Sequence, residues 1–145
     1  MADITEKYSE EFKNKLFFTH NIAVRWEEMD VNGHINYANY FSYFSEARIE
    51  AGGQSEFAEL RENSISPVVY KAEMDFLKEL FHPDTVHIVT WVEELIGKTR
   101  AVIRQNLYSL GRKEFISSAR FFVVFMNIDT RKIVRLPEGI MKKFL

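Results

Sequence analysis

The sequence has no cysteine, no long hydrophobic run and no surplus of basic residues. The absence of cysteine excludes disulfide bridges, thiolate metal ligands and a cysteine nucleophile, and it fits a reducing compartment. The longest unbroken apolar run, Phe121 to Met126, is far shorter than the ~20 residues that a membrane-spanning helix needs. The N-terminal segment carries charges throughout and lacks the apolar stretch of a secretory signal. We therefore expect a cytoplasmic protein with no membrane span.

Charge and motif content exclude several further classes of site. The 19 Lys and Arg residues nearly balance 21 Asp and Glu residues, whereas a nucleic-acid-binding module usually carries a basic surplus. The sequence contains no Gly-x-Ser-x-Gly nucleophile elbow, no phosphate-binding glycine loop and no His-Glu-x-x-His zinc helix. His82 and His87 are separated by Pro83, and their spacing does not suit a metal pair. We expect no nucleic-acid partner, no metal and no bound redox cofactor.

The residues that are present favour one aromatic-rich domain. A chain of 145 residues has room for one domain, and its 46% hydrophobic and 28% charged residues are typical of a protein that folds around a core. Aromatic residues make up 14% of the chain, with 13 Phe among them, which suits pleated sheet surfaces and subunit interfaces. We expect a single domain over residues 1–145, in which residues 1–17 form a short helix or a loose arm.

The hydrophobic pattern predicts an α+β fold. Alternation from His20 to Glu27 indicates a strand, with Ile22, Val24 and Trp26 on one face. Apolar residues at helical spacing follow from Asn36, a candidate N-cap, and end at glycines 52 and 53. A weaker helical stretch (54–63), four alternating runs (70–76, 86–92, 101–108 and 115–128) and a closing turn or short helix (137–140) complete the chain. The run 115–128 is apolar on both faces, which is typical of a central strand. This order predicts a five-stranded antiparallel sheet around one central helix.

The densest group of unusual residues lies between the first strand and the long helix. It reads Asp30-Val31-Asn32-Gly33-His34-Ile35-Asn36-Tyr37-Ala38-Asn39-Tyr40, and the helix then carries Glu46-Ala47-Arg48. In this order the residues resemble the hotdog-fold acyl-CoA thioesterases, in particular the hydroxybenzoyl-CoA thioesterase branch. The resemblance spans nearly the whole chain and departs from the family at one turn, where Glu79-Leu80 and His82-Pro83 stand in place of a Pro after the second strand and a Gly before the Asp of the next turn.

The resemblance implies a hotdog fold and hydrolysis of a thioester to a carboxylic acid and coenzyme A. It implies for Asp30 the role of nucleophile or general base, and no cofactor beyond the coenzyme A of the substrate. The spacing of the residues independently suits such a site, because a helix start supplies free backbone amides and a positive dipole end for an oxyanion. The backbone amide of Tyr37 is the candidate donor. His34 and Asn36 are further candidates, although a loop hydrogen bond and a helix cap would also explain them.

Four residues are candidates for substrate binding. Tyr40 and Phe41 suit the wall of an acyl pocket, and they equally suit core packing. Lys98 and Arg100, in the turn before the third alternating run, could contact the phosphates of coenzyme A, with Arg104 nearby. Short basic turns are, however, often simply solvated.

The long helix is aromatic on several sides, and one sheet covers only one of them. The sequence therefore predicts a homodimer or homotetramer. Two other functions stay open: hydrolysis of acyl groups on acyl carrier protein, whose acidic surface would favour a broader basic patch, and a non-catalytic hotdog module that binds an acyl or aromatic ligand. Asp30 argues against the non-catalytic module. Sequence does not separate a nucleophilic from a general-base role.

Overall fold

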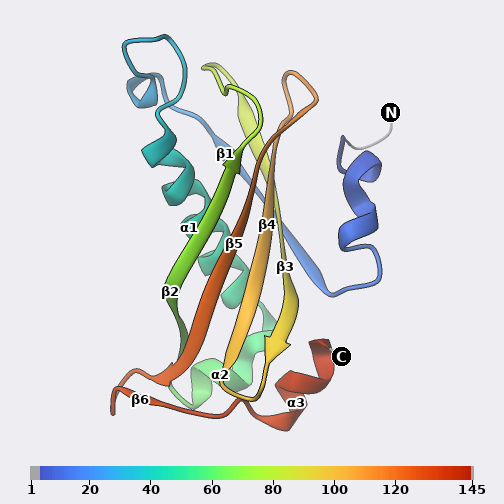
Figure 1. Ribbon diagram of the computed structural model, residues 1–145, viewed down its shortest axis with the longest axis vertical. Coiled ribbons are helices and arrows are strands. Elements are labelled where there is room, and N and C mark those ends of the chain that lie inside the picture. Colours follow the sequence, from blue (N-terminus) through green and yellow to red (C-terminus); the bar gives the residue numbers. More distant parts are fainter. Residues whose placement is uncertain (1–3, 145) are drawn as a thin grey trace.

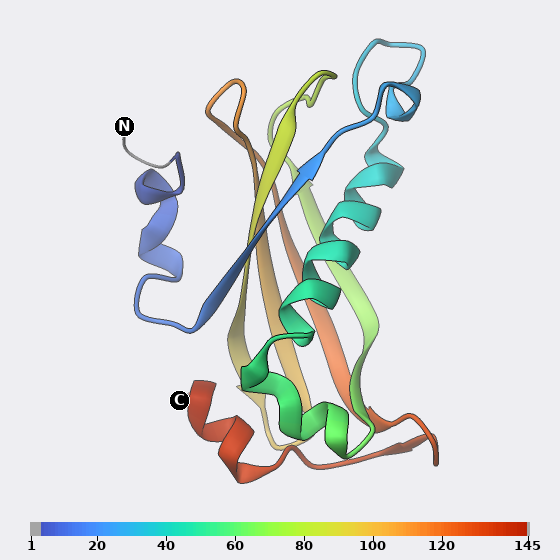
Figure 2. The same ribbon diagram turned by 180° about the vertical axis from the view of Figure 1, so that it is seen from behind.

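The structure is a computed structural model that describes residues 4–144 (Figures 1 and 2). Its strands are β1 (Phe17–Ala23), β2 (Ile65–Phe76), β3 (Thr85–Ile96), β4 (Arg100–Ser109), β5 (Glu114–Asn127) and β6 (Lys132–Ile133). Its α-helices are α1 (Tyr37–Gly52), α2 (Ala58–Glu62) and α3 (Glu138–Met141). Short 3-10 helices lie at η1 (Ile4–Glu11), η2 (Trp26–Glu28), η3 (Ser55–Phe57) and η4 (Lys142–Phe144). No helix within this part of the chain is long and apolar enough to cross a membrane.

The strands form one antiparallel sheet in the order β1-β3-β4-β5-β2, and the sheet curls around α1 (Figure 2). This confirms the predicted α+β hotdog architecture. The predicted central strand is β5, which lies between β4 and β2. The two-residue strand β6 pairs with β5 and makes the sheet six-stranded, an addition that the sequence pattern did not indicate.

Helix α1 begins and ends where the sequence predicts. The side-chain oxygen of Asn36 accepts a hydrogen bond from the Ala38 backbone amide at 2.8 Å, which confirms the N-cap. The helix buries the face formed by Tyr40, Tyr43, Phe44, Ala47 and Ala51. Burial of each large side chain contributes roughly 1.5–3 kcal/mol, so this contact between helix and sheet supplies much of the core.

The predicted limits of three strands are wrong, and one of these strands, predicted over 86–92, is β3 and continues to Ile96. The first strand spans Phe17–Ala23 and not His20–Glu27, because the Glu28 carboxylate accepts a hydrogen bond from the Arg25 amide at 2.7 Å and closes the chain into η2. Trp26 is consequently 69% exposed instead of lying on the strand face. The second strand starts at residue 65 and includes a proline, which is tolerated because β2 is at the sheet edge.

The N-terminal segment packs on the outer face of the sheet, away from α1. Residues 4–11 form η1, and Phe12 and Tyr8 join a cluster with Trp91 and Tyr108. Strand β3 is therefore apolar on both faces because α1 covers one and the N-terminal segment covers part of the other. Residues 1–3 of the predicted arm lie outside the described part of the chain.

Candidate active site

The loop between η2 and α1 is closed by its own backbone. Met29 and Ile35 form an antiparallel bridge, and the Asp30 amide donates to the His34 carbonyl oxygen at 2.8 Å. The Gly33 amide donates to the Asp30 carbonyl oxygen at 3.1 Å, and Gly33 has φ of 82°. Only glycine adopts this left-handed conformation without strain, so the Asn-Gly turn predicted from sequence holds Asp30 directly before the long helix.

The Asp30 carboxylate has one oxygen fixed and the other available. Oδ1 accepts a hydrogen bond from the Asn32 amide at 2.9 Å. Oδ2 lies 3.8 Å from His34 Nδ1, too far for a hydrogen bond, and no other donor within residues 4–144 reaches it. The side chain is 23% exposed, so solvent and a substrate can approach the available oxygen.

The first turn of α1 leaves one amide uncommitted. The amide of Ala38 donates to the Asn36 side chain, and the amide of Asn39 donates to the Asn36 carbonyl oxygen at 3.0 Å. The amide of Asn36 itself donates to the Glu28 carbonyl oxygen at 2.9 Å. For the Tyr37 amide, the described residues supply no acceptor. The Tyr37 N–H is therefore free at the positive end of the helix dipole. The helix cap alone explains the role of the Asn36 side chain.

His34 lies between two carboxylates. Its Nε2 is 4.0 Å from Glu79 Oε1, and its side chain is 16% exposed. Its Nδ1 faces Asp30 and is buried without a hydrogen-bond partner in the described part of the chain. Sequence reasoning noted residue 79 only as part of a departure from the family pattern, and missed its proximity to His34. No local signal could reveal this contact, because the chain returns to the loop only after β2.

The two predicted pocket residues lie in different environments. Tyr40 is fully buried, and burial raises the pKa of its phenol to about 12, so that it stays neutral near pH 7. Phe41 is 49% exposed on the side of α1 that faces away from the sheet interior. The ring centroid of Tyr37 lies 4.2 Å from that of Phe76 on β2, with the two ring planes tilted by 33°, a contact that the sequence did not indicate.

Within one chain, the turn that carries Lys98 and Arg100, here called the basic turn, lies far from the Asp30 loop. The loop lies at one end of the sheet and the turn between β3 and β4, which carries Lys98, lies at the opposite end (Figure 1). The Arg100 guanidinium lies over the exposed ring of Tyr70, 5.3 Å from its centroid. Any joint action of Lys98 and Arg100 with Asp30 therefore requires a second chain.

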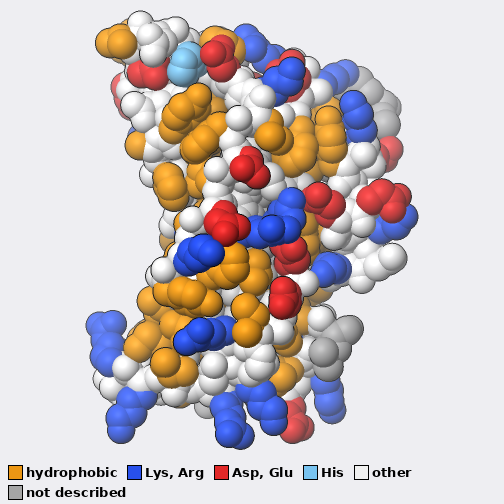
Figure 3. All heavy atoms as spheres, viewed as in Figure 1, with side chains coloured by type: hydrophobic (Ala, Val, Ile, Leu, Met, Phe, Trp, Pro, Cys, Tyr) orange, Lys and Arg blue, Asp and Glu red, His pale blue; other side chains and the backbone are white. Residues whose placement is uncertain are grey.

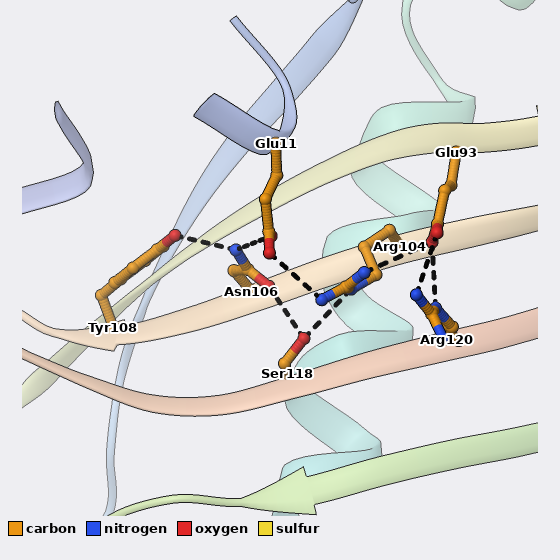
Figure 4. A network of polar contacts seen from close by, with 7 residues as sticks. All are labelled: Glu11, Glu93, Arg104, Asn106, Tyr108, Ser118 and Arg120. Carbon is orange, nitrogen blue, oxygen red and sulfur yellow. Dashed lines mark hydrogen bonds and ion pairs between the residues drawn. The ribbon is translucent and has the colours of Figure 1, made fainter. Parts of the chain in front are cut away.

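Arg104 is committed to a polar network on the outer sheet face (Figure 4). Its guanidinium lies 3.4 Å from a Glu11 oxygen and 3.5 Å from a Glu93 oxygen, and its Nε donates to Ser118 at 3.1 Å. Arg120 also pairs with Glu93 at 3.1 Å. Because two carboxylates already neutralise Arg104, its predicted contribution to phosphate binding has no support. Within residues 4–144, no three His, Asp or Glu side chains are grouped to hold a metal ion.

Comparison with known proteins places this geometry in context. The sequence model of the family described as "Thioesterase-like superfamily" matches residues 24–144. A relative from Aquifex aeolicus (strain VF5), named "Putative esterase", is 27% identical over 127 residues, which cover 86% of this chain and 95% of that protein.

Solved structures give the same result. A "putative Thioesterase from Pseudomonas aeruginosa" is 26% identical with a TM-score of 0.73, and the alignment covers 86% of this chain and 95% of that one. A DHNA-CoA thioesterase from Staphylococcus aureus is 25% identical with a TM-score of 0.73, over 87% of this chain and 89% of that one. The fold and the order of its elements are therefore shared over most of the chain.

Proposed function

Because this chain belongs to the thioesterase-like superfamily and is a thioester hydrolase, we propose that it hydrolyses acyl-CoA at the Asp30 loop. One observation carries the proposal. The Asp30 carboxylate has an available oxygen in a closed loop, and the helix that follows begins with the Tyr37 amide, for which residues 4–144 supply no acceptor. Thioester hydrolysis needs a base or nucleophile and an oxyanion donor, and these two groups supply them.

The Tyr37 amide stabilises the charge that develops on the carbonyl oxygen of the thioester. Asp30 then acts in one of two ways. As general base, it takes a proton from water, the resulting hydroxide adds to the carbonyl carbon, the C–S bond breaks, and the thiolate of coenzyme A receives the proton. As nucleophile, its oxygen adds to the same carbon and expels the thiolate, and water then hydrolyses the mixed anhydride. Neither route needs a group beyond this chain, the substrate and water.

A homodimer is part of the proposal, since the exposed apolar residues concentrate along β2 and the neighbouring side of α1. These residues are Tyr37, Phe41, Ile49, Val68, Val69, Tyr70 and Phe76. Figure 3 shows hydrophobic side chains along this side of the molecule. Strand β2 is also an unpaired sheet edge, which proteins usually cover. Two-fold pairing of β2 edges would run the strands antiparallel and bring the partner's basic turn toward the Asp30 loop.

Sedimentation at low micromolar concentration tests the dimer. We expect a dimer for the native chain and a monomer for Phe41→Glu, which puts a charge on the exposed side of α1. Phe17→Glu is the matched control, because Phe17 is 42% exposed on β1, at the opposite edge of the sheet from β2, and its replacement should leave the dimer intact. A well-folded monomer of the native chain would contradict this part of the proposal.

Release of free thiol from a panel of acyl-CoA substrates, aliphatic and aromatic, tests the reaction. We expect turnover with at least one acyl-CoA, and a lower kcat/KM for the same acyl group on acyl carrier protein, because the chain has nearly balanced charge. The absence of thiol release across the whole panel would favour a non-catalytic binding module. A higher kcat/KM for the carrier-protein substrate would identify acyl carrier protein, and not coenzyme A, as the carrier of the acyl group.

A further inference from the structure

A cavity of about 410 Å³ lies under the C-terminal half of α1, at the opposite end of this helix from the Asp30 loop. Its walls come from α1 and strands β1 to β5, and Phe57, Leu60 and Ile140 close its lower end. In Figure 2, α2 and α3 lie below the end of α1. Ile49 and Val69 line the cavity and are 71% and 42% exposed in the single chain, which places its opening between α1 and β2, beside the β2 edge that the proposed dimer pairs. No residue of the 29–36 loop contributes to its lining.

Two arginines line this apolar cavity, and they differ in their partners. Arg61 donates hydrogen bonds to the carbonyl oxygens of Gly52 and Gln54 and thereby caps the end of α1. Arg48 forms no ion pair with any carboxylate within residues 4–144. Burial lowers the pKa of Arg48 to about 10, so the guanidinium is still charged at pH 7. Arg48 is partly buried, so its guanidinium loses part of its solvation by water, and no carboxylate within residues 4–144 replaces what is lost.

A buried amide fixes the position of Arg48. Gln105 has no exposed surface, and its Nε2 donates to the Phe44 carbonyl oxygen at 3.0 Å and to Thr90 Oγ1 at 2.9 Å. Its Oε1 is thereby turned toward Arg48 and accepts from Nη1 at 2.9 Å. The guanidinium carbon lies 3.9 Å from the centroid of the Phe121 ring. These contacts hold the arginine in place and leave its Nε and Nη2 without a described acceptor.

We propose that this cavity binds a carboxylic acid with an apolar body, whose carboxylate pairs with Arg48. A guanidinium offers two parallel N–H groups that match the two oxygens of a carboxylate, and such charge-assisted pairs are among the stronger polar contacts in proteins. The ligand supplies the counter-charge that the described part of the chain does not provide. Its apolar body occupies the space between Leu60, Leu95 and Phe125.

The cavity volume limits the size of this acid. At roughly 30 Å³ for each water-sized group, 410 Å³ accommodates about a dozen heavy atoms, which matches a medium-chain fatty acid or a substituted aromatic acid. The acid released by the proposed hydrolysis belongs to this class, and so does a free fatty acid from another source. Binding requires only the folded chain and not the reaction at Asp30.

Calorimetric titration of the native protein with octanoate and with octanamide tests the charge requirement. The two probes have the same chain length and differ in the carboxylate. We expect octanoate to bind at least about tenfold more tightly at pH 7, in line with one charge-assisted pair in a poorly hydrated site. Equal affinities, or the absence of binding by octanoate, would overturn the proposal.

Three variants locate the site. Arg48→Gln should reduce the preference for octanoate over octanamide to less than about threefold, and Arg61→Gln, which changes the other arginine of the same cavity, should retain it. Leu95→Trp keeps Arg48 and fills the cavity, so it should weaken both probes at least about tenfold. Preference retained in Arg48→Gln, or native affinity in Leu95→Trp, would place binding elsewhere. If Arg48→Gln does not fold, the comparison of octanoate with octanamide and the Leu95→Trp variant still test whether the cavity binds the acid.

Labelled ligands separate this site from the catalytic one and identify the source of the acid. Octanoate with ¹³C in its carboxyl group should give the same shifted carbon resonance in the native protein and in Asp30→Asn. Octanoyl-CoA with the same label should give that resonance only in the native protein, because it must first be hydrolysed. If added octanoate gives the signal and the thioester does not, the cavity binds free acid and octanoyl-CoA is not a substrate. Absence of the signal with added octanoate refutes the cavity proposal alone.

Discussion

The two ends of α1 hold a charge in different ways. At the first end, the Asp30 carboxylate is held by backbone groups of its own loop and is partly open to solvent. At the other end, the Arg48 guanidinium is held by Gln105, a side chain 57 positions away, and lines an apolar cavity. A solvated, locally held carboxylate suits reaction with water, whereas a fixed cation in an apolar cavity suits retention of an anion. The difference separates chemistry at one end from binding at the other.

Asp30→Asn should remove most of the activity at the Asp30 loop and leave ligand binding in the Arg48 cavity intact. The change keeps the size and the turn-forming ability of the residue and removes the carboxylate, so kcat should fall at least about a hundredfold, within the ~10²–10⁴ range for general-base catalysis. The melting temperature and octanoate binding should stay close to native. Asp129→Asn, at an exposed turn, is the matched control and should keep full activity. Retention of more than roughly a tenth of native turnover would remove Asp30 from the mechanism.

The substitutions Gly33→Ala and Gly52→Ala should change the free energy of unfolding in opposite directions. Gly33 has φ of 82°, so Gly33→Ala should cost about 1–2 kcal/mol of unfolding free energy and lower kcat roughly tenfold as the loop shifts. Gly52 ends the helix at the other site with open space around an added Cβ, and Gly52→Ala should stabilise the chain by up to about 1 kcal/mol. Chemical denaturation and steady-state kinetics measure both. Destabilisation by both changes to the same extent would contradict this contrast.

Alanine at both Lys98 and Arg100 tests whether the basic turn contacts coenzyme A phosphates from a partner chain. KM for acyl-CoA should rise about fivefold with little change in kcat, consistent with one or two exposed charge contacts. A short pantetheine thioester, which lacks the nucleotide phosphates, should be hydrolysed as before. Equal losses with both substrates would indicate a structural role for the turn.

His34→Gln should have a smaller effect on kcat than Asp30→Asn. The histidine packs between Asp30 and Glu79 without a hydrogen bond to either carboxylate, so we expect it to support the loop, and kcat should fall only a few-fold. Glu79→Gln serves as a comparison from the same cluster and should change kcat less. A hundredfold loss in His34→Gln alone would instead make His34 a proton carrier.

Local structure at the Asp30 end was predictable because its determinants are close in sequence. Turn residues, the Asn36 cap and the end of α1 at Gly52 follow from hydrogen bonds and backbone preferences within a few positions. The fold class was also predictable, since period-two runs after one long apolar helix allow few arrangements. The early end of β1 was not predicted, because it depends on a hydrogen bond from the Arg25 amide to the Glu28 carboxylate. The alternation of apolar residues does not reveal such a contact.

The sequence by itself therefore determined an antiparallel sheet around one helix and the limits of α1, which depend on local preference and hydrophobic period. The hotdog assignment and the role of the Asp30 loop came from the resemblance to a family. Only the tertiary structure decided which charges have partners. Arg104 and Arg48 look alike as isolated basic residues, yet within residues 4–144 the fold places two carboxylates beside Arg104 and none beside Arg48. The reason is that the electrostatic environment of a side chain depends on groups dozens of residues away, which meet only when the sheet closes around α1.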